Sequence, residues 1–222
     1  MTRRVMLIVA AAAVAVAACA SDAAVDCPRC PDPVTTPPPE ATKPKPAKPP
    51  RDAAARQTDR RQTLAFVGFT KDGAKFMVEA NDEFMGDVLQ VWDASAGRIV
   101  DSLVTTSFTR ASALKKLLKK HAVVELTEGS AKRPDGDLAL LGADDGDWLV
   151  IYAQEGERAV PVLRLPRLVD KDRRADASVA RILWAPSGDY AVVLSRQVLP
   201  APFAFASDYV DIWRYDPDEL PF

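Results

Sequence analysis

The stretch that decides the fold is Leu64-Ala65-Phe66-Val67-Gly68-Phe69-Thr70-Lys71-Asp72-Gly73-Ala74-Lys75-Phe76-Met77-Val78. Two short apolar runs, rich in Phe and Val, flank the Asp72-Gly73 pair. β-branched and aromatic residues favour strands, and Asp-Gly readily adopts the positive φ angles of a tight hairpin turn. The stretch therefore predicts a β-hairpin.

The same alternation of apolar runs and turns continues downstream. After a polar loop, a further apolar run covers Val88 to Asp93, Ala96-Gly97 turns the chain, and Ile99 to Leu103 follows. Short apolar runs bounded by Gly-containing turns indicate strands. We therefore expect four strands between residues 64 and 103.

This layout recurs twice, each time as a Gly-containing turn followed by apolar runs. The first recurrence has Arg133-Pro134-Asp135-Gly136 as its turn, with runs at 138–141, 148–152 and 160–165 and a Glu155-Gly156 turn between the last two. The second has Ala185-Pro186-Ser187-Gly188 as its turn, with runs at 182–184, 190–194 and 210–215. The chain thus predicts three related groups of strands.

These groups resemble blades of WD-repeat and periplasmic TolB-like β-propellers. The blade consensus has an apolar residue before Ser-Pro-Asp-Gly, a strand, a strand that ends in Trp-Asp, and then Gly. The closest match is Phe69 to Gly73 with Val91-Trp92-Asp93 and Gly97. Its turn glycines, however, recur at irregular spacings, and three blades are fewer than a closed propeller needs. The resemblance implies a mainly β domain of irregular, blade-like antiparallel sheets, open or sandwich-like, and not a closed propeller.

One amphipathic helix interrupts the strands, and we expect it near residues 109–121. Its apolar stripe has the i, i+3, i+4 spacing of a helix face, and its lysines lie largely off that stripe. The stripe consists of Ala113, Leu114, Leu117 and Leu118, and the lysines are Lys115, Lys116, Lys119 and Lys120. Ser107 or Thr109 is suited to cap the helix. Strands with such a docked helix also resemble a family of predicted secreted bacterial proteins of unknown function.

The N-terminus carries a different signal. Arg3 and Arg4 precede an apolar run that begins at Val5 and closes with Val16-Ala17-Ala18-Cys19. This order resembles the signal peptide and lipobox of bacterial lipoproteins. In that family the cysteine thiol is diacylglycerated, the chain is cut just before the cysteine, and its new amino group is acylated. The resemblance implies a signal peptide at 1–18, peptidase recognition through Val16, Ala17 and Ala18, and lipid attachment at Cys19.

The length of the apolar run supports a signal over a membrane span. Val5 to Ala18 would make about 21 Å of helix, which is short of a hydrocarbon core of roughly 30 Å. An uncleaved anchor, or an ordinary signal with an incidental cysteine, are the alternatives. Ala20 follows the cysteine, which in enteric-type bacteria goes with outer-membrane sorting. We therefore expect a lipid-anchored protein of the cell envelope, at the outer membrane and facing the periplasm or the surface.

Residues 19–61 are predicted to be a disordered tether. Ten of the 18 prolines lie between Pro28 and Pro50, and proline favours an extended, polyproline-like chain. A Pro-rich ligand for an aromatic groove is the alternative. Cys27 and Cys30 lack the further ligands of a zinc site, the histidine of a haem site and the context of a redox motif, so a local disulfide or intermolecular bridge is expected. The β-rich globular domain then covers 62–222.

Composition and motifs argue against most kinds of chemistry. The formal net charge is −2, which does not favour nucleic acid as a partner. His121 has no triad partners nearby, and Asp144-Asp145-Gly146-Asp147 lacks the EF-hand pattern. The four tryptophans fall at repeat-equivalent strand positions, which predicts core packing. We expect no catalytic residues, no metal and no cofactor.

One apolar stretch is a candidate partner surface. Leu199 to Ala206 is broken by prolines, and its Phe203 and Phe205 either fold over the core or contact a partner. We expect a non-enzymatic interaction or assembly module with the membrane, through its lipid, and an envelope protein as partners. The alternative is a carbohydrate-active or other hydrolase on a propeller-like scaffold. A pocket with two carboxylates about 5–10 Å apart would favour the hydrolase.

Overall fold

The computed structural model describes residues 49–53, 61–83, 86–125, 130–170, 173–200 and 205–221. All of them belong to one compact unit, which runs from Pro44 to Phe222. The predictions for the signal peptide, Cys19, Cys27, Cys30 and most of the tether lie outside the described residues. The same holds for Phe203.

The first sheet grows from the hairpin that the sequence predicted. Its strands are β2 (Gln62–Thr70), β3 (Lys75–Asp82), β4 (Gly86–Asp93), β5 (Arg98–Thr105) and β6 (Val123–Glu125). They pair antiparallel in the order β5-β4-β3-β2-β6. Gly73 has φ +69° in the β2–β3 turn, and its N–H donates to the Thr70 carbonyl at 2.9 Å. We call this the helix-side sheet.

The central sheet is built from three long antiparallel strands. They are β12 (Asp176–Trp184), β13 (Tyr190–Leu199) and β14 (Phe205–Arg214), in the order β12-β13-β14. The two strands of the β13–β14 pair are longer than the apolar runs that predicted them. They continue through buried polar residues such as Gln197 and Asp208.

The outer sheet is mixed. Its antiparallel strands are β7 (Ala139–Asp145), β8 (Trp148–Glu155) and β9 (Arg158–Pro166), and β1 (Arg51–Asp52) pairs parallel with β9. Arg51 and Asp52 lie within the segment that the sequence assigned to the tether. The remaining short elements are β10 (Val169–Asp170), β11 (Arg173–Arg174) and the 3-10 helix η1 (Pro217–Glu219).

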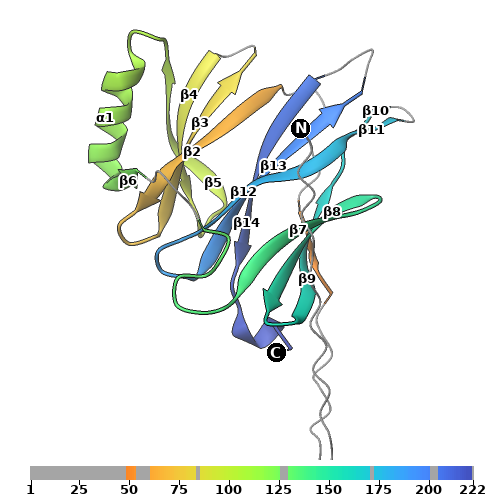
Figure 1. Ribbon diagram of the computed structural model, residues 1–222. Coiled ribbons are helices and arrows are strands. Elements are labelled where there is room, and N and C mark those ends of the chain that lie inside the picture. The colour runs from red at the N-terminus through yellow and green to blue at the C-terminus, as the bar shows by residue number, and fades with distance from the viewer. Residues whose placement is uncertain are drawn as a thin grey trace, which may run out of the picture. The chain divides into compact units, whose positions relative to one another are not determined.

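The central sheet lies between the other two sheets (Figure 1). On one face, Leu183, Tyr190 and Val192 pack against the phenylalanines of the helix-side sheet. On the other face, Trp184 and Trp213 pack edge to face, with ring centroids 5.6 Å apart, among aliphatic residues of the outer sheet. Both faces of the central sheet are therefore buried in apolar cores.

The helix α1 (Arg110–His121) covers the opposite face of the helix-side sheet (Figure 1). Leu117 is 1% exposed and packs against Met77 and Leu89, whereas Leu114 is only half-buried. The lysines named above are exposed, as predicted. In the part of the chain that is described, no helix is long and apolar enough to cross a membrane.

The N-terminus of α1 differs from the predicted cap. Thr109 is the N-cap residue, but its side chain makes no capping hydrogen bond. Instead, Thr109 Oγ1 accepts a hydrogen bond from the Thr106 backbone N–H at 2.9 Å, which closes the turn before the helix. The local turn thus competes for the hydroxyl that would otherwise cap the helix.

The predicted fold class is confirmed. The structure is mainly β, with antiparallel and mixed sheets, one α-helix in the described residues, and no described sheet closed on itself. The sheets stack face to face because each presents an apolar face that must be buried.

Candidate functional site

The three turns that repeat in the sequence pack against one another at one end of the central sheet. A Cβ atom added to Gly73 would lie 3.1 Å from Ser187 Oγ in the β12–β13 turn. A Cβ atom added to Gly188 would lie 3.1 Å from Arg133 Nε and from Asp135 Oδ1 in the turn before β7. The Arg133 Nε also donates to the Gly188 carbonyl at 3.0 Å. A side chain at Gly73 or Gly188 would crowd the neighbouring turn, so glycine helps these turns to pack closely.

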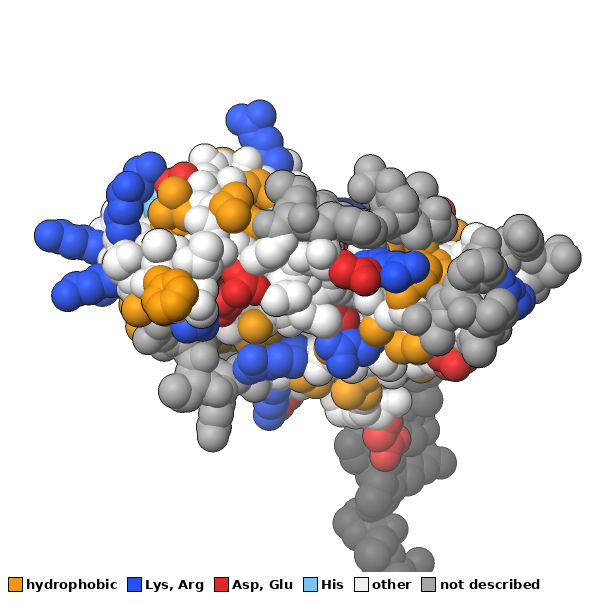
Figure 2. Space-filling model, turned by 90° about the horizontal axis from the view of Figure 1, so that it is seen from above, with side chains coloured by type: hydrophobic (Ala, Val, Ile, Leu, Met, Phe, Trp, Pro, Cys, Tyr) orange, Lys and Arg blue, Asp and Glu red, His pale blue; other side chains and the backbone are white. Residues whose placement is uncertain are grey.

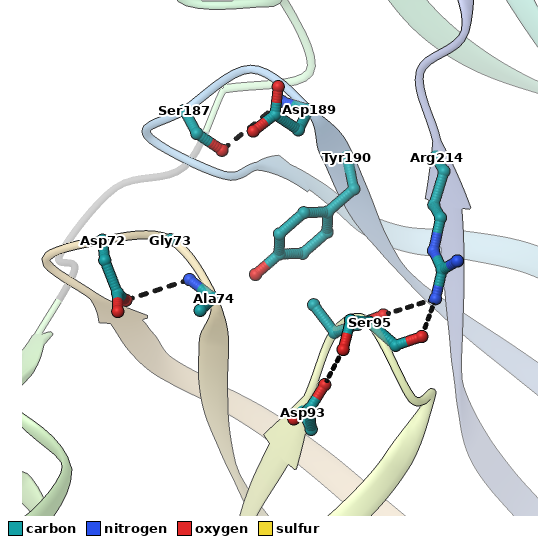
Figure 3. Close-up of a pocket in the computed structure, with 10 residues that line it drawn as sticks. Asp72, Gly73, Ala74, Asp93, Ser95, Ser187, Asp189, Tyr190 and Arg214 are labelled. Carbon is teal, nitrogen blue, oxygen red and sulfur yellow. Dashed lines mark hydrogen bonds between the residues drawn. The ribbon is translucent and has the colours of Figure 1, made fainter.

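A pocket of about 410 Å³ opens where the β2–β3, β4–β5 and β12–β13 turns meet (Figure 3). Its charged and phenolic lining residues are Asp72, Asp93, Asp189, Tyr190 and Arg214, and the other residues of the lining are small. The volume lies in the range of small-ligand sites, roughly 300–1,000 Å³. We call this the turn pocket.

Asp72 is fixed by its own turn. Its Oδ1 accepts a hydrogen bond from Thr70 Oγ1 at 2.5 Å and from the Ala74 N–H at 3.0 Å. These hydrogen bonds favour the ionised carboxylate, so they lower the pKa of Asp72 below its usual value. Asp72 is therefore an anion at neutral pH.

Asp93 is held in the same way at the end of β4. Its Oδ1 accepts a hydrogen bond from Ser95 Oγ at 2.6 Å (Figure 3) and another from the Ala96 N–H at 2.8 Å. The hydroxyl of Ser95 and the Ala96 amide lower the pKa of Asp93. The pocket thus holds at least two fixed negative charges, from two different turns.

Arg214 lies at the edge of the pocket, and its guanidinium donates hydrogen bonds to backbone carbonyls. Its Nη2 donates to the Ala94 carbonyl at 3.2 Å and also to the Ser95 carbonyl (Figure 3). These bonds tie β14 to the β4–β5 turn. Within the described residues Arg214 forms no salt bridge with an acidic side chain, and the cation that acts on Asp72 and Asp93 is Lys75, whose charge also lowers the pKa of both carboxyls.

Tyr190 is the buried polar group of the pocket. The residue is 6% exposed, and its ring packs edge to face on Phe69 with centroids 5.9 Å apart. Its hydroxyl points into the space between Ala74 and the Asp93–Ser95 turn (Figure 3) and has no hydrogen-bond partner among the described residues. Burial, followed by the nearby carboxylates, raises the pKa of Tyr190. The phenol is therefore neutral at physiological pH and keeps its proton.

The predicted partner residue Phe205 lies away from the turn pocket. It begins β14 at the other end of the central sheet, is half-buried, and lies beneath the Arg61 guanidinium, which is 5.0 Å from the ring centroid. It lines a smaller pocket of about 280 Å³ with Arg61 and Glu83. A partner surface at Phe205 stays a prediction.

Exposed apolar side chains also occur on the edge strand β5 and just after it. Ile99, Val100 and Val104 on β5 are exposed, and Phe108 is 94% exposed. Figure 2 shows the end of the molecule at the top of Figure 1, where Lys and Arg side chains project from the side that carries α1 and hydrophobic side chains lie beside them. This surface combines positive charge with apolar contact area.

The other acidic and histidine candidates are engaged in ion pairs. In the β7–β8 hairpin, Asp144 pairs with Arg167 and Asp147 pairs with Arg174. His121 Nε2 lies 2.7 Å from Asp101 Oδ2, at the C-terminus of α1. In the described part of the chain, no three acidic, histidine or cysteine side chains group as metal ligands would.

The sequence did not single out the turn pocket as a site. It identified Asp72 and Ser187 only as parts of turns, Asp93 only as the end of a strand, and Tyr190 only as the start of a strand. The signal that could have found the pocket is the repetition itself. Turns at equivalent positions of stacked sheets lie at the same end, so their polar residues converge.

Comparison with models of known protein families, with curated proteins and with solved structures finds no match. The function is therefore inferred from the residues and the geometry of this chain.

Proposed function

We propose that the chain is a lipid-anchored protein of the bacterial cell envelope whose β domain is a non-enzymatic binding module. The anchoring is inferred from the Val16 to Cys19 motif. The observation that carries the binding role is the turn pocket, in which fixed carboxylates lie around a buried tyrosine hydroxyl that has no hydrogen-bond partner in the described part of the chain.

The protonation of the pocket favours binding over hydrolysis. A glycoside hydrolase needs a carboxylic acid that is still protonated at its working pH. The pKa values of Asp72 and Asp93 are both lowered, so neither is suited to donate a proton. Each is also committed to holding its turn. These carboxylates are better suited to attract a ligand than to transfer protons.

A hydrolase is the second candidate, because the pocket brings three carboxylates together. Asp189 lies on the rim of the pocket opposite Asp72 and Asp93 (Figure 3). A pocket that holds two carboxylates is the feature that the sequence analysis named as favouring a carbohydrate-active enzyme. The two candidates predict different effects of Asp93→Asn, because asparagine keeps the turn acceptor but loses the charge.

Binding and hydrolysis are separated by one pair of assays. Cross-linking in intact cells, followed by mass spectrometry, should identify a partner with the unchanged chain and with Asp137→Asn, but with reduced yield for Asp93→Asn. Asp137 is an exposed control that pairs with Lys132 and is not part of the pocket lining. Hydrolysis of chromogenic glycosides that Asp93→Asn abolishes would instead establish the enzyme.

Anchoring is tested at Cys19. Cys19→Ala should move the protein out of the membrane fraction or leave it as an uncut precursor, because no thiol is left to acylate. Mass spectrometry of the mature N-terminus provides the direct reading. A mature N-terminus away from Cys19, or one without an acyl group, would contradict the proposal.

A further inference from the structure

We infer that the turn pocket binds a primary ammonium group. The inference deepens the proposed function, since it presupposes a binding module and names the chemistry of what is bound. It depends on the charge of the pocket, the free hydrogen-bonding capacity of its lining and the cost of burying Tyr190.

The charge of the lining favours a cation. Three carboxylates, from Asp72, Asp93 and Asp189, outnumber the Arg214 guanidinium in the lining and the Lys75 ammonium, whose charge acts on Asp72 and Asp93. The guanidinium is already directed at the backbone carbonyls of the β4–β5 turn. A positively charged ligand would therefore meet a net negative site whose charges are fixed before it arrives, which lowers the cost of organising the pocket.

The hydrogen-bonding capacity of the lining favours a donor. An ionised carboxylate offers about four acceptor positions, and the turn bonds to Asp72 and to Asp93 use about half of them. The Tyr190 oxygen is a further acceptor. An ammonium group carries three donors and no acceptor, so it complements this lining.

Tyr190 is the part of the pocket that the fold does not explain. Asp72 and Asp93 stabilise their turns, but the Tyr190 hydroxyl makes no hydrogen bond among the described residues. Burying an unpartnered hydroxyl destabilises a folded protein, and phenylalanine would make the same ring contacts without that penalty. A ligand that hydrogen-bonds to the hydroxyl would account for its presence.

The central sheet offers a matched control. Ser195, in the middle of β13, is also fully buried and its hydroxyl also lacks a partner among the described residues. It is not part of the pocket lining. Ser195→Ala therefore removes a buried hydroxyl of the same kind without touching the turn pocket.

The ammonium can come from a lysine side chain of a protein partner or from a free amine. Asp72, Ala74, Ser95 and Asp189 are exposed on the rim, so a longer chain can leave the pocket toward solvent. The probes that distinguish the two sources are Nα-acetyl-lysine methylamide and 1,5-diaminopentane. The neutral control is the lysine probe with its side-chain nitrogen acetylated.

The experiment is a titration of the purified full-length chain carrying ¹³C-methyl alanine, followed by NMR. Ala74 and Ala94 line the pocket, so their methyl groups report directly on occupancy. We expect saturable shifts with the lysine probe and none with its acetylated form. A response to the lysine probe alone indicates a protein side chain, and an equal response to the diamine indicates a free amine.

The variants test the contacts one by one. Asp93→Asn should weaken binding about tenfold, because one charge-assisted contact is lost. Tyr190→Phe should weaken it about fivefold through loss of one hydrogen bond, whereas Ser195→Ala and Asp137→Asn should leave it unchanged. Binding should also fall in acid, but only below the ordinary aspartate range, because the pKa values of Asp72 and Asp93 are lowered, and it should fall above about pH 10, as the amine loses its proton.

Three results would overturn the inference. One is the absence of shifts with either amine, another is an equal response to the acetylated probe, and the third is full binding by Tyr190→Phe and Asp93→Asn together. If partner cross-links that depend on Asp93 persist in cells while the amines fail, the ammonium assignment is wrong and the binding function stands. If both fail, the proposed function itself is wrong.

Discussion

The two ends of the central sheet differ in the hydrogen bonding of their large buried polar side chains. At the end where β13 finishes and β14 begins, Asp208 and Gln197 are 2% and 0% exposed and both accept hydrogen bonds, although the buried Nε of the neighbouring Arg167 has no partner among the described residues. At the turn end, the hydroxyl of Tyr190 is as deeply buried and makes none among the described residues.

The hydrogen bonds at the first end connect the sheets. Asp208 accepts from Arg196 Nε at 2.7 Å and from the Leu64 N–H of the helix-side sheet at 2.9 Å. Gln197 accepts from the Leu168 N–H at 2.6 Å and donates to the Pro166 carbonyl, at the end of the outer sheet, at 2.9 Å. These two side chains therefore join the central sheet to both of its neighbours.

The difference separates polar groups that stabilise the fold from the Tyr190 hydroxyl, which we propose is kept for a ligand. A buried polar group that is fully bonded adds to stability, whereas one without a partner subtracts from it. The unpartnered hydroxyl at the turn end should therefore lower the free energy of unfolding, whereas the bonded side chains at the other end should raise it. Substitutions at each end measure these contributions.

The largest effect is expected for Asp208→Ala. The change removes the carboxylate that Arg196 and the Leu64 amide share, so it should lower the free energy of unfolding by about 3 kcal/mol. Urea denaturation checks this, with Asp137→Ala as the exposed control. A loss no greater than that of the control would mean that Asp208 does not join the sheets.

Gln197→Leu should have the next largest effect. Leucine fills similar space but removes the partner of the buried Leu168 amide and of the half-buried Pro166 carbonyl, so a loss of about 2 kcal/mol is expected. The same denaturation assay applies. Unchanged stability would show that the outer sheet is held to the central sheet by apolar contacts alone.

A smaller effect is expected at the surface, between α1 and β5. Hydrogen bonds from the side chains of Lys120 and His121 lower the pKa of Asp101 to about 2. A folded-state pKa below the unfolded value stabilises the protein above about pH 4, and this contribution is lost as the pH falls toward 2. Asp101→Asn should flatten the stability profile in that window by less than about 1 kcal/mol, because Lys120 is largely exposed. If Asp101→Asn left the pH dependence of stability unchanged, the Asp101–Lys120 ion pair would not contribute to stability.

The sequence predicted the strands and the helix that form the apolar cores. It did not predict the buried polar side chains that join the sheets. The run around Asp72-Gly73 predicted the first hairpin, and the Leu and Lys spacing predicted α1 with Leu117 buried, because both patterns are local. The strands β13 and β14 were predicted too short. Polar residues such as Gln197 ordinarily indicate the end of a strand, and only the neighbouring sheets explain their burial.

The turn pocket could not be predicted for a related reason. Asp72, Asp93 and Tyr190 are far apart in the chain, and each has an ordinary local role in a turn or at a strand start. Their convergence follows from how the helix-side and central sheets stack, which no local pattern specifies. The repeated turns were nevertheless visible in the sequence, so the end of the fold at which they meet was open to inference.

The most direct test of the central claim is the free energy of unfolding of Tyr190→Phe, measured in urea without ligand beside Gln197→Leu. If the hydroxyl is kept for a ligand, Tyr190→Phe should be as stable as the unchanged chain or more stable by up to about 1 kcal/mol. It should still bind the lysine probe about fivefold more weakly. A loss of stability comparable to that of Gln197→Leu would show that the hydroxyl has a structural partner, and would contradict the claim that the two ends differ.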